Sequence, residues 1–168
     1  KIVPQMKNSI DFFRLFSGSY GISSNLDVFV LTPNLKNVQL AINNDVNNYS
    51  FITSVSNMFQ KKNTNLTIGD TKTEIQNMID LVKTTNEDNN IKLYISCVTE
   101  CPIIGKIDNH IILSEIMYYY YAHGKQISNI CLSDTCGTLR FKDFKFIVDT
   151  LIEKGVDLEI FGLHLHKQ

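Results

Sequence analysis

The histidine pair His164 and His166 is the pattern in this sequence that says most about chemistry. Two-residue spacing on a β-strand sends both imidazoles to one face, within reach of one cation, while Phe161, Leu163 and Leu165 point to the other face and would pack against helices. Neutral imidazole is a good ligand for a divalent ion. The spacing alone is a weak signal: it suits a metal site at the end of a strand and, equally, two partly exposed terminal histidines or an incidental pair.

Asp134 and Thr135 end the expected strand that precedes the histidines. A carboxylate and a hydroxyl at that position would lie at the same rim of the sheet as the imidazoles, where they can hold a substrate oxygen or a metal-bound water. The alternative is that Asp134 only accepts backbone N–H bonds from the following loop, as aspartates commonly do at such positions.

Four cysteines are present, and two of them are separated by three residues, as Cys97 and Cys101. A structural zinc site or a redox pair of the common kind uses a spacing of two residues instead. We expect all four cysteines to be reduced thiols, with these two packed in a tight turn after a strand.

The segment Lys61-Lys62-Asn63 follows an expected strand and a short helix. Its two ammonium groups can meet the phosphates of a nucleotide-like ligand as point charges. The alternative is a basic pair that only contacts solvent.

Apolar stretches of strand length alternate with segments of helical period, the pattern typical of parallel strands joined by crossover helices. We expect five strands, at residues 27–32, 49–55, 91–98, 127–133 and 158–166. Thr67 and Asp108 are expected N-caps, and the tyrosine run at 118–121 is expected to be half core and half surface. The apolar helix faces are formed by Ile75, Met78, Ile79 and Val82, by Ile112, Ile116 and Tyr119, and by Phe144, Ile147, Val148 and Leu151.

The expected architecture is one α/β domain over residues 1–168, because no linker or change of composition divides the chain. Periodicity alone leaves open a barrel or an open, doubly wound sheet. In both folds the functional groups gather at the carboxyl ends of the strands, which is where the histidines and Asp134 lie.

Composition excludes several classes of protein. The net charge is -1, with no dense basic stripe, so nucleic acid is not an expected partner. No apolar run approaches the length of a membrane span, and no signal peptide is recognisable. We expect an intracellular, soluble protein, cytoplasmic or mitochondrial.

Six short pieces of the sequence, read in order, resemble the hydroxymethylglutaryl-CoA lyase family, and they extend over essentially the whole chain. Six matches in register are far more specific than any one of them. The pieces are Val3-Pro4-Gln5-Met6, Leu31-Thr32-Pro33-Asn34-Leu35-Lys36, Lys61-Lys62-Asn63-Thr64-Asn65, Ser96-Cys97 with Cys101-Pro102 and Gly105-Lys106-Ile107, Ser133-Asp134-Thr135 with Gly137, and His164-Leu165-His166.

The resemblance implies part of an eight-stranded (β/α) TIM barrel and a divalent cation, Mg²⁺ or Mn²⁺, that holds the substrate's oxygens. His164 and His166 match two metal ligands, Asp134 and Thr135 match residues near the substrate, and Asn63 matches a contact to coenzyme A. The implied reaction is carbon–carbon cleavage of 3-hydroxy-3-methylglutaryl-CoA to acetyl-CoA and acetoacetate. The partner is thus an acyl-CoA, and a homodimer is compatible with the resemblance.

The sequence also departs from the family. The first-strand segment with the metal aspartate and the catalytic arginine has no match, so no catalytic residue is identified and we expect this chain alone to be inactive. Lys167, Glu100 and Ser133 replace an aspartate and two glycines of the family pattern. A non-catalytic paralogue that serves as a binding module is the first alternative, and a related acyl-CoA synthase of aldol type is the second.

Overall fold

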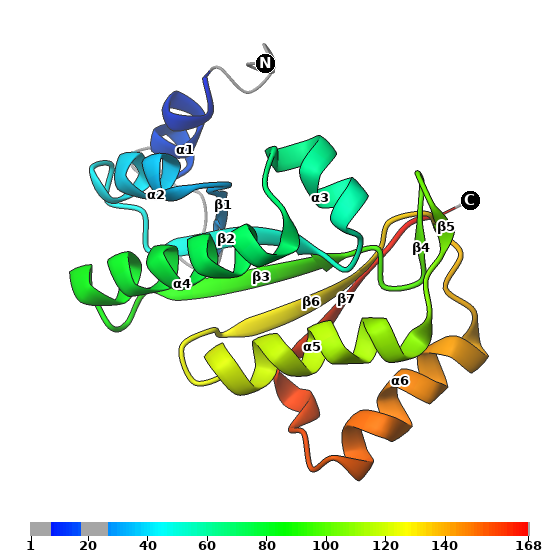
Figure 1. Cartoon of the computed structure of the whole chain (residues 1–168). Helices are drawn as coiled ribbons and strands as arrows, with labels where there is room; N and C mark the ends of the chain where they lie inside the picture. Colours follow the sequence, from blue (N-terminus) through cyan, green and yellow to red (C-terminus); the bar gives the residue numbers. More distant parts are fainter. Residues whose placement is uncertain (1–7, 18–26, 168) are drawn as a thin grey trace.

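The fold is a five-stranded parallel sheet whose strands alternate with helices (Figure 1). The structure is a computed structural model that describes residues 8–17 and 27–167; the piece Val3-Pro4-Gln5-Met6 lies outside the described residues. The sheet has the order β1-β2-β3-β6-β7, with β1 at Val30–Leu31, β2 at Asn48–Ser54, β3 at Asn90–Ser96, β6 at Asn129–Asp134 and β7 at Phe161–Leu165. The five parallel strands expected from the sequence are therefore confirmed.

The helices fall between these strands, and their apolar faces are the expected ones. Ile79 and Ile116 are fully buried, and the tyrosine run is divided as expected, because Tyr119 is buried whereas Tyr121 is 64% exposed. The helices are α1 at Ser9–Ser17, α2 at Leu35–Ile42, α3 at Asn57–Thr64, α4 at Ile68–Thr85, α5 at Asn109–His123 and α6 at Phe141–Glu153. None of the helices in the described part of the chain is long and apolar enough to cross a membrane.

Helix starts follow the expected capping chemistry. The Thr67 hydroxyl accepts a hydrogen bond from the Asp70 N–H, and the Asp70 carboxylate accepts one from the Thr67 N–H, which makes a capping box at the start of α4. The Asp108 carboxylate accepts from the His110 N–H at the start of α5. Both predicted N-caps are confirmed.

The core lies between the sheet and the helices, and α4 and α5 run along the strands in front of the sheet in Figure 1. Phe51, Leu93 and Ile130 point into this core and are fully buried, whereas the alternate residues Ile52 and Tyr94 are only partly buried and lie outside the core cluster. The alternation gives the sheet an apolar, helix-covered face and a second, more polar face.

Two features differ from the expectation. The last strand begins three residues late, because Leu158–Ile160 form a 3₁₀ turn that starts at Asp157. Leu163 and Leu165 were expected to pack against helices, and this was wrong: they are 46% and 61% exposed.

A short antiparallel hairpin follows β3, where only a tight turn was expected from the sequence. It pairs β4 at Glu100–Cys101 with β5 at Gly105–Lys106. Cys97, with a φ of 64°, turns the chain away from β3, and Gly105, with a φ of 78°, adopts the left-handed conformation that glycine tolerates best. Strands of two residues carry no periodicity that could have predicted them.

Candidate functional site

A row of polar side chains crosses the sheet near the carboxyl ends of four strands. Ser54 on β2 is the register partner of Ser96 on β3, Ser96 is the partner of Ser133 on β6, and Ser133 is the partner of His164 on β7. Register partners on neighbouring strands project to the same face about 4.8 Å apart. The structure thus joins three hydroxyls and an imidazole that are far apart in the sequence.

Ser133 lies in this row between Ser96 and His164. Its hydroxyl is buried and makes no hydrogen bond of ordinary geometry among the described residues; its polar neighbour is the Cys131 thiol, a weak acceptor, where it opposes the rise of the thiol pKa on burial. Buried hydroxyls are normally paired, so this oxygen is available to a ligand or a water molecule beside His164.

His164 and His166 project from β7 to the same face, as their spacing predicted. Their Nε2 atoms are 3.0 Å apart, and both side chains are exposed. Two imidazole nitrogens bound about 2.1 Å from one ion, at a right angle to each other, lie about 3.0 Å apart. The ring of Tyr94 on β3 meets His164 edge-on, with 6.0 Å between the centroids. The geometry of the pair therefore fits two adjacent ligands of one cation.

The pair is not a complete metal site. Within residues 8–17 and 27–167, no group of three or more His, Cys, Asp or Glu side chains is placed to hold an ion. A cation on the two histidines would take its other ligands from solvent, from substrate or from protein groups beyond the described residues.

Asp134 ends β6 and holds the loop that follows it. One carboxylate oxygen accepts from the Thr138 N–H and the other from the Leu139 N–H, both at 2.9 Å. The side chain is buried, with 3% of its surface exposed. These bonds give Asp134 the loop-holding role that was the structural alternative, and its contact with substrate stays a prediction.

Thr135 links the loop after β6 to the end of β3. Its hydroxyl accepts a hydrogen bond of 2.8 Å from the Cys97 N–H. The hydroxyl keeps its own O–H, which can donate to a substrate oxygen. The substrate contact of Thr135 therefore stays a prediction.

Asn63 lies in the last turn of α3, apart from the row of serines. Its side-chain amide donates to the Phe59 carbonyl one turn earlier, and the residue is exposed, as are Lys61 and Lys62. No described contact joins Asn63 to the histidines or to Asp134. The predicted coenzyme A contact therefore stays a prediction on the surface of α3.

Tyr94 and Lys92 were not singled out from the sequence. Both alternate with buried residues of β3, and the Lys92 ammonium lies 5.4 Å from the centre of the Tyr94 ring. The period of two along β3 carried this information, because polar residues that alternate with Ile91, Leu93 and Ile95 must face away from the core.

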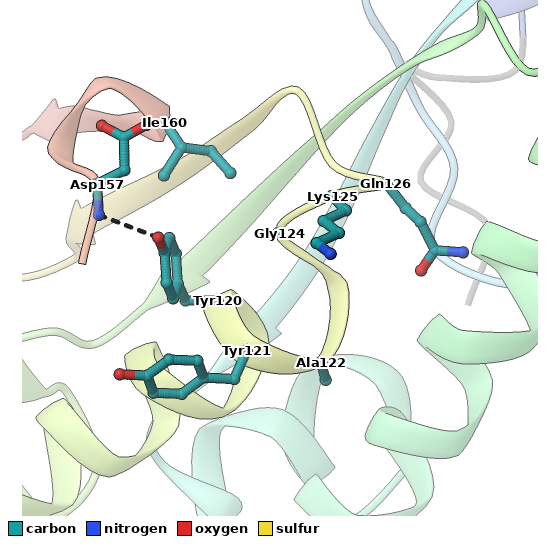
Figure 2. Close-up of a pocket in the computed structure, with 8 residues that line it drawn as sticks. All are labelled: Tyr120, Tyr121, Ala122, Gly124, Lys125, Gln126, Asp157 and Ile160. Carbon is teal, nitrogen blue, oxygen red and sulfur yellow. Dashed lines mark hydrogen bonds between the residues drawn. The ribbon is translucent and has the colours of Figure 1, made fainter. Parts of the chain in front are cut away.

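A cavity of about 480 Å³ lies at the other ends of the strands (Figure 2). Tyr120, Tyr121 and Gln126 line it before β6, and Asp157 and Ile160 line it before β7. Figure 2 shows the Tyr120 hydroxyl pointing to Asp157, whose backbone N–H donates to it at 3.0 Å. Because this cavity is at the amino ends of the strands, it is separate from the histidine site.

The curated proteins and the solved structures that this chain resembles are hydroxymethylglutaryl-CoA lyases. The human mitochondrial hydroxymethylglutaryl-CoA lyase is 26% identical over 166 residues, which cover 99% of this chain and 48% of the human protein. The HMG-CoA lyase of Acinetobacter baumannii, solved with coenzyme A and 3-methylmalate, has a TM-score of 0.80 and 21% identity over 98% of this chain and 50% of that chain. The hydroxymethylglutaryl-CoA lyase of Pseudomonas aeruginosa gives a TM-score of 0.80 at 22% identity, over 97% of this chain and 51% of that chain.

The chain spans about half the length of the relatives that it matches. Its parallel sheet and alternating helices match part of the TIM barrel of these lyases. The model of the HMGL-like family matches residues 3–168. With this match over nearly the whole sequence, the chain belongs to the HMGL-like family.

Proposed function

We propose that the whole protein of which this chain forms a part cleaves 3-hydroxy-3-methylglutaryl-CoA to acetyl-CoA and acetoacetate. The observation that carries the proposal is the convergence of the His164 and His166 Nε2 atoms, 3.0 Å apart, beside the buried and unpaired Ser133 hydroxyl. Family membership supports a lyase-like enzyme, and the names of the relatives give the substrate class.

His164 and His166 would together hold the divalent cation, Mg²⁺ or Mn²⁺, that supplies Lewis-acid stabilisation of substrate oxygens in this chemistry. Ser133 and Thr135 each carry an O–H that can donate to a substrate carboxylate or carbonyl oxygen. The Tyr94 ring lies edge-on to the His164 ring. In this proposal the side chains of β3, β6 and β7 bind and orient the substrate, and the group that removes the proton from the C3 hydroxyl is outside the described residues.

The substrate's coenzyme A would extend toward α3, where the exposed Lys61, Lys62 and Asn63 can meet phosphate and amide groups. Coenzyme A accompanies 3-methylmalate in the solved lyase of Acinetobacter baumannii, which supports an acyl-CoA ligand for this family. The proposed acyl-CoA binding along α3 is compatible with a homodimer.

A non-catalytic binding module is the second candidate. It is favoured by the two-ligand histidine site and by Asp134, whose carboxylate oxygens both accept backbone N–H bonds instead of projecting freely to a ligand. Such a module would bind an acyl-CoA through the same polar face without cleaving it.

The test is Mn²⁺ binding by calorimetry and acetyl-CoA release from 3-hydroxy-3-methylglutaryl-CoA, both on the whole protein. We expect the double variant His164→Ala/His166→Ala to lose both Mn²⁺ binding and acetyl-CoA release. His110→Ala is the matched control, because His110 is also exposed but lies on α5 against Phe146. Substrate binding without acetyl-CoA release would favour the binding module, and loss of Mn²⁺ binding in the control alone would contradict the assigned ligands.

A further inference from the structure

Another cavity lies between the β4–β5 hairpin, the loop after β6 and the start of α6. Its volume is about 320 Å³, which is enough for a small ligand. The hairpin and the first turn of α6 lie at the same end of the sheet in Figure 1. The residues that line the cavity are all polar or charged, and none of them belongs to the row of serines and His164. They are Thr99, Glu100, Lys106, Thr138, Arg140 and Asp143.

Two threonine hydroxyls of this cavity are buried and have no hydrogen-bond partner among the described residues. They belong to Thr99, which is 5% exposed, and to Thr138. The backbone groups of the same two residues are paired, because the Thr99 carbonyl accepts from the Ile107 N–H and the Thr138 N–H donates to the Asp134 carboxylate. Buried hydroxyls are normally paired, so these two oxygens are available to a ligand in the cavity.

The cavity contains two cationic side chains. Arg140 directly precedes α6, and its guanidinium makes neither a capping hydrogen bond nor an ion pair with the described residues. The planar guanidinium matches a carboxylate in bidentate geometry, and the amino end of a helix also favours a negative group. The Lys106 ammonium lies 3.8 Å from the Asp143 carboxylate, which is longer than a hydrogen bond, so its N–H donors are also available.

Two carboxylates line the same cavity and balance these cations. Asp143 is 8% exposed in the first turn of α6, and Glu100 is the register partner of Lys106 across the hairpin. The four charged side chains sum to zero, so the carboxylates would repel a ligand with several negative charges and the cations one with several positive charges. A ligand that carries one charge of each sign, and no net charge, suits this lining best.

We propose that this cavity binds a small zwitterion, an α-amino acid. The carboxylate of the ligand accepts hydrogen bonds from the Arg140 guanidinium and from the Thr99 and Thr138 hydroxyls. The ammonium group of the ligand donates to the carboxylates of Asp143 and Glu100. Each charge of the ligand thus has an opposite charge and a hydrogen-bond partner, which a charged group needs when it leaves water.

The cavity adjoins the loop that Asp134 holds. The Thr138 N–H donates to the Asp134 carboxylate, and the same residue lines the cavity, so a bound amino acid would restrain the loop that follows β6. The inference rests on the lining residues alone and does not depend on the proposed lyase activity. Amino-acid binding should therefore persist in the double variant His164→Ala/His166→Ala.

The test is calorimetric titration of the protein with the common L-α-amino acids, one at a time, and with inorganic phosphate. We expect at least one amino acid to bind. Its amide, which lacks the carboxylate, and its deamino acid, which lacks the ammonium group, should each bind about tenfold more weakly, because each loses charge-assisted hydrogen bonds. Binding of no amino acid, equal binding of the deamino acid, or binding of phosphate alone would overturn the proposal.

Variants locate the binding to this cavity. Arg140→Gln should weaken amino-acid binding about tenfold, and Thr99→Val should weaken it severalfold. Thr99→Val keeps the shape of the side chain and removes an unpaired buried hydroxyl, so its melting temperature should stay the same or rise. Lys142→Gln is the matched control, because Lys142 is exposed on α6 but does not line the cavity. Unaltered binding in Arg140→Gln, or an equal loss in Lys142→Gln, would contradict the assigned site.

Discussion

Ser133 and His164 are register partners on β6 and β7, and the buried Ser133 hydroxyl beside that histidine makes no hydrogen bond of ordinary geometry in the described part of the chain. An unpaired buried hydroxyl destabilises a folded protein, since it loses its bonds to water on burial. At the rim that carries the histidines, however, the free Ser133 hydroxyl can bond to a ligand. Removal of this hydroxyl is therefore expected to preserve or raise the stability of the fold but to lower the affinity for ligand.

The variant Ser133→Ala should leave the free energy of unfolding unchanged or raise it by up to about 1 kcal/mol, because it removes an unpaired polar group. Urea unfolding followed by circular dichroism measures this change. Substrate affinity of the whole protein should fall in the same variant. A loss of stability of several kcal/mol would show that the hydroxyl is bonded in the folded protein.

The control for Ser133→Ala is Thr53→Val. The Thr53 hydroxyl is also buried on the sheet, but it shares a hydrogen bond of 2.9 Å with the Tyr119 hydroxyl. Its removal leaves the tyrosine oxygen unpaired in the core, so stability should fall by about 1–3 kcal/mol.

The variant Asp134→Asn should destabilise the protein by about 1.5–3 kcal/mol. The change replaces one of two accepting oxygens with an NH₂ group that faces a backbone N–H in a buried site. Chemical denaturation measures the loss. Asp149→Asn, on the exposed face of α6 where Asp149 pairs with Lys145, should change stability by less than about 0.5 kcal/mol. Equal effects of the two variants would argue against the loop-holding role.

The variant Thr67→Ala should cost about 1 kcal/mol, because it removes the side-chain oxygen that caps the first turn of α4. It should also raise the pKa of the Asp70 carboxyl toward its ordinary value, since hydrogen bonds from the Thr67 side chain and backbone lower that pKa. Nuclear magnetic resonance titration of Asp70 checks this shift. Thr85→Ala, at the other end of the same helix, is the control and should leave the Asp70 titration unaltered.

The sequence was sufficient for the five strands of the parallel sheet and for the apolar faces of α4, α5 and α6. Ile79 on α4 and Ile116 on α5 were assigned to the core by their helical spacing, and both are fully buried. The strands were found because β-branched runs of strand length are bounded by polar loops. Helical and strand periods report which face a residue occupies, and burial of that face is the dominant stabilising effect.

Relations between elements could not be read from the same patterns. A period of two places Ser133 and His164 on a face, but it does not give the register that makes them neighbours. The role of Asp134 was equally ambiguous, because a carboxylate after a strand suits both a substrate oxygen and two backbone N–H groups. The exposure of Leu165 depends on whether another element covers β7, which its own sequence does not state.

Burial of the His123 side chain should make the stability of the fold sensitive to acid. The side chain is 2% exposed at the end of α5, where its ring lies against the rings of Tyr118 and Tyr119. Burial lowers the pKa of His123 below its ordinary value of 6.5, opposed by weaker effects of Asp80 and Gln126. The folded state therefore holds the neutral ring, while the unfolded state takes up a proton near pH 6.5.

Stability linked to His123 is thus complete above pH 6.5 and is lost as the pH falls below that value, until the folded-state pKa is reached. The loss approaches about 1.4 kcal/mol for each pH unit within this window. Urea unfolding at pH 7.5, 6.5 and 5.5 measures it, and His123→Phe should make the dependence shallower because phenylalanine keeps the ring contacts with Tyr118 and Tyr119 but does not titrate. His110→Gln, which alters an exposed histidine, should keep the wild-type slope, and an unaltered slope in His123→Phe would assign the acid sensitivity to other groups.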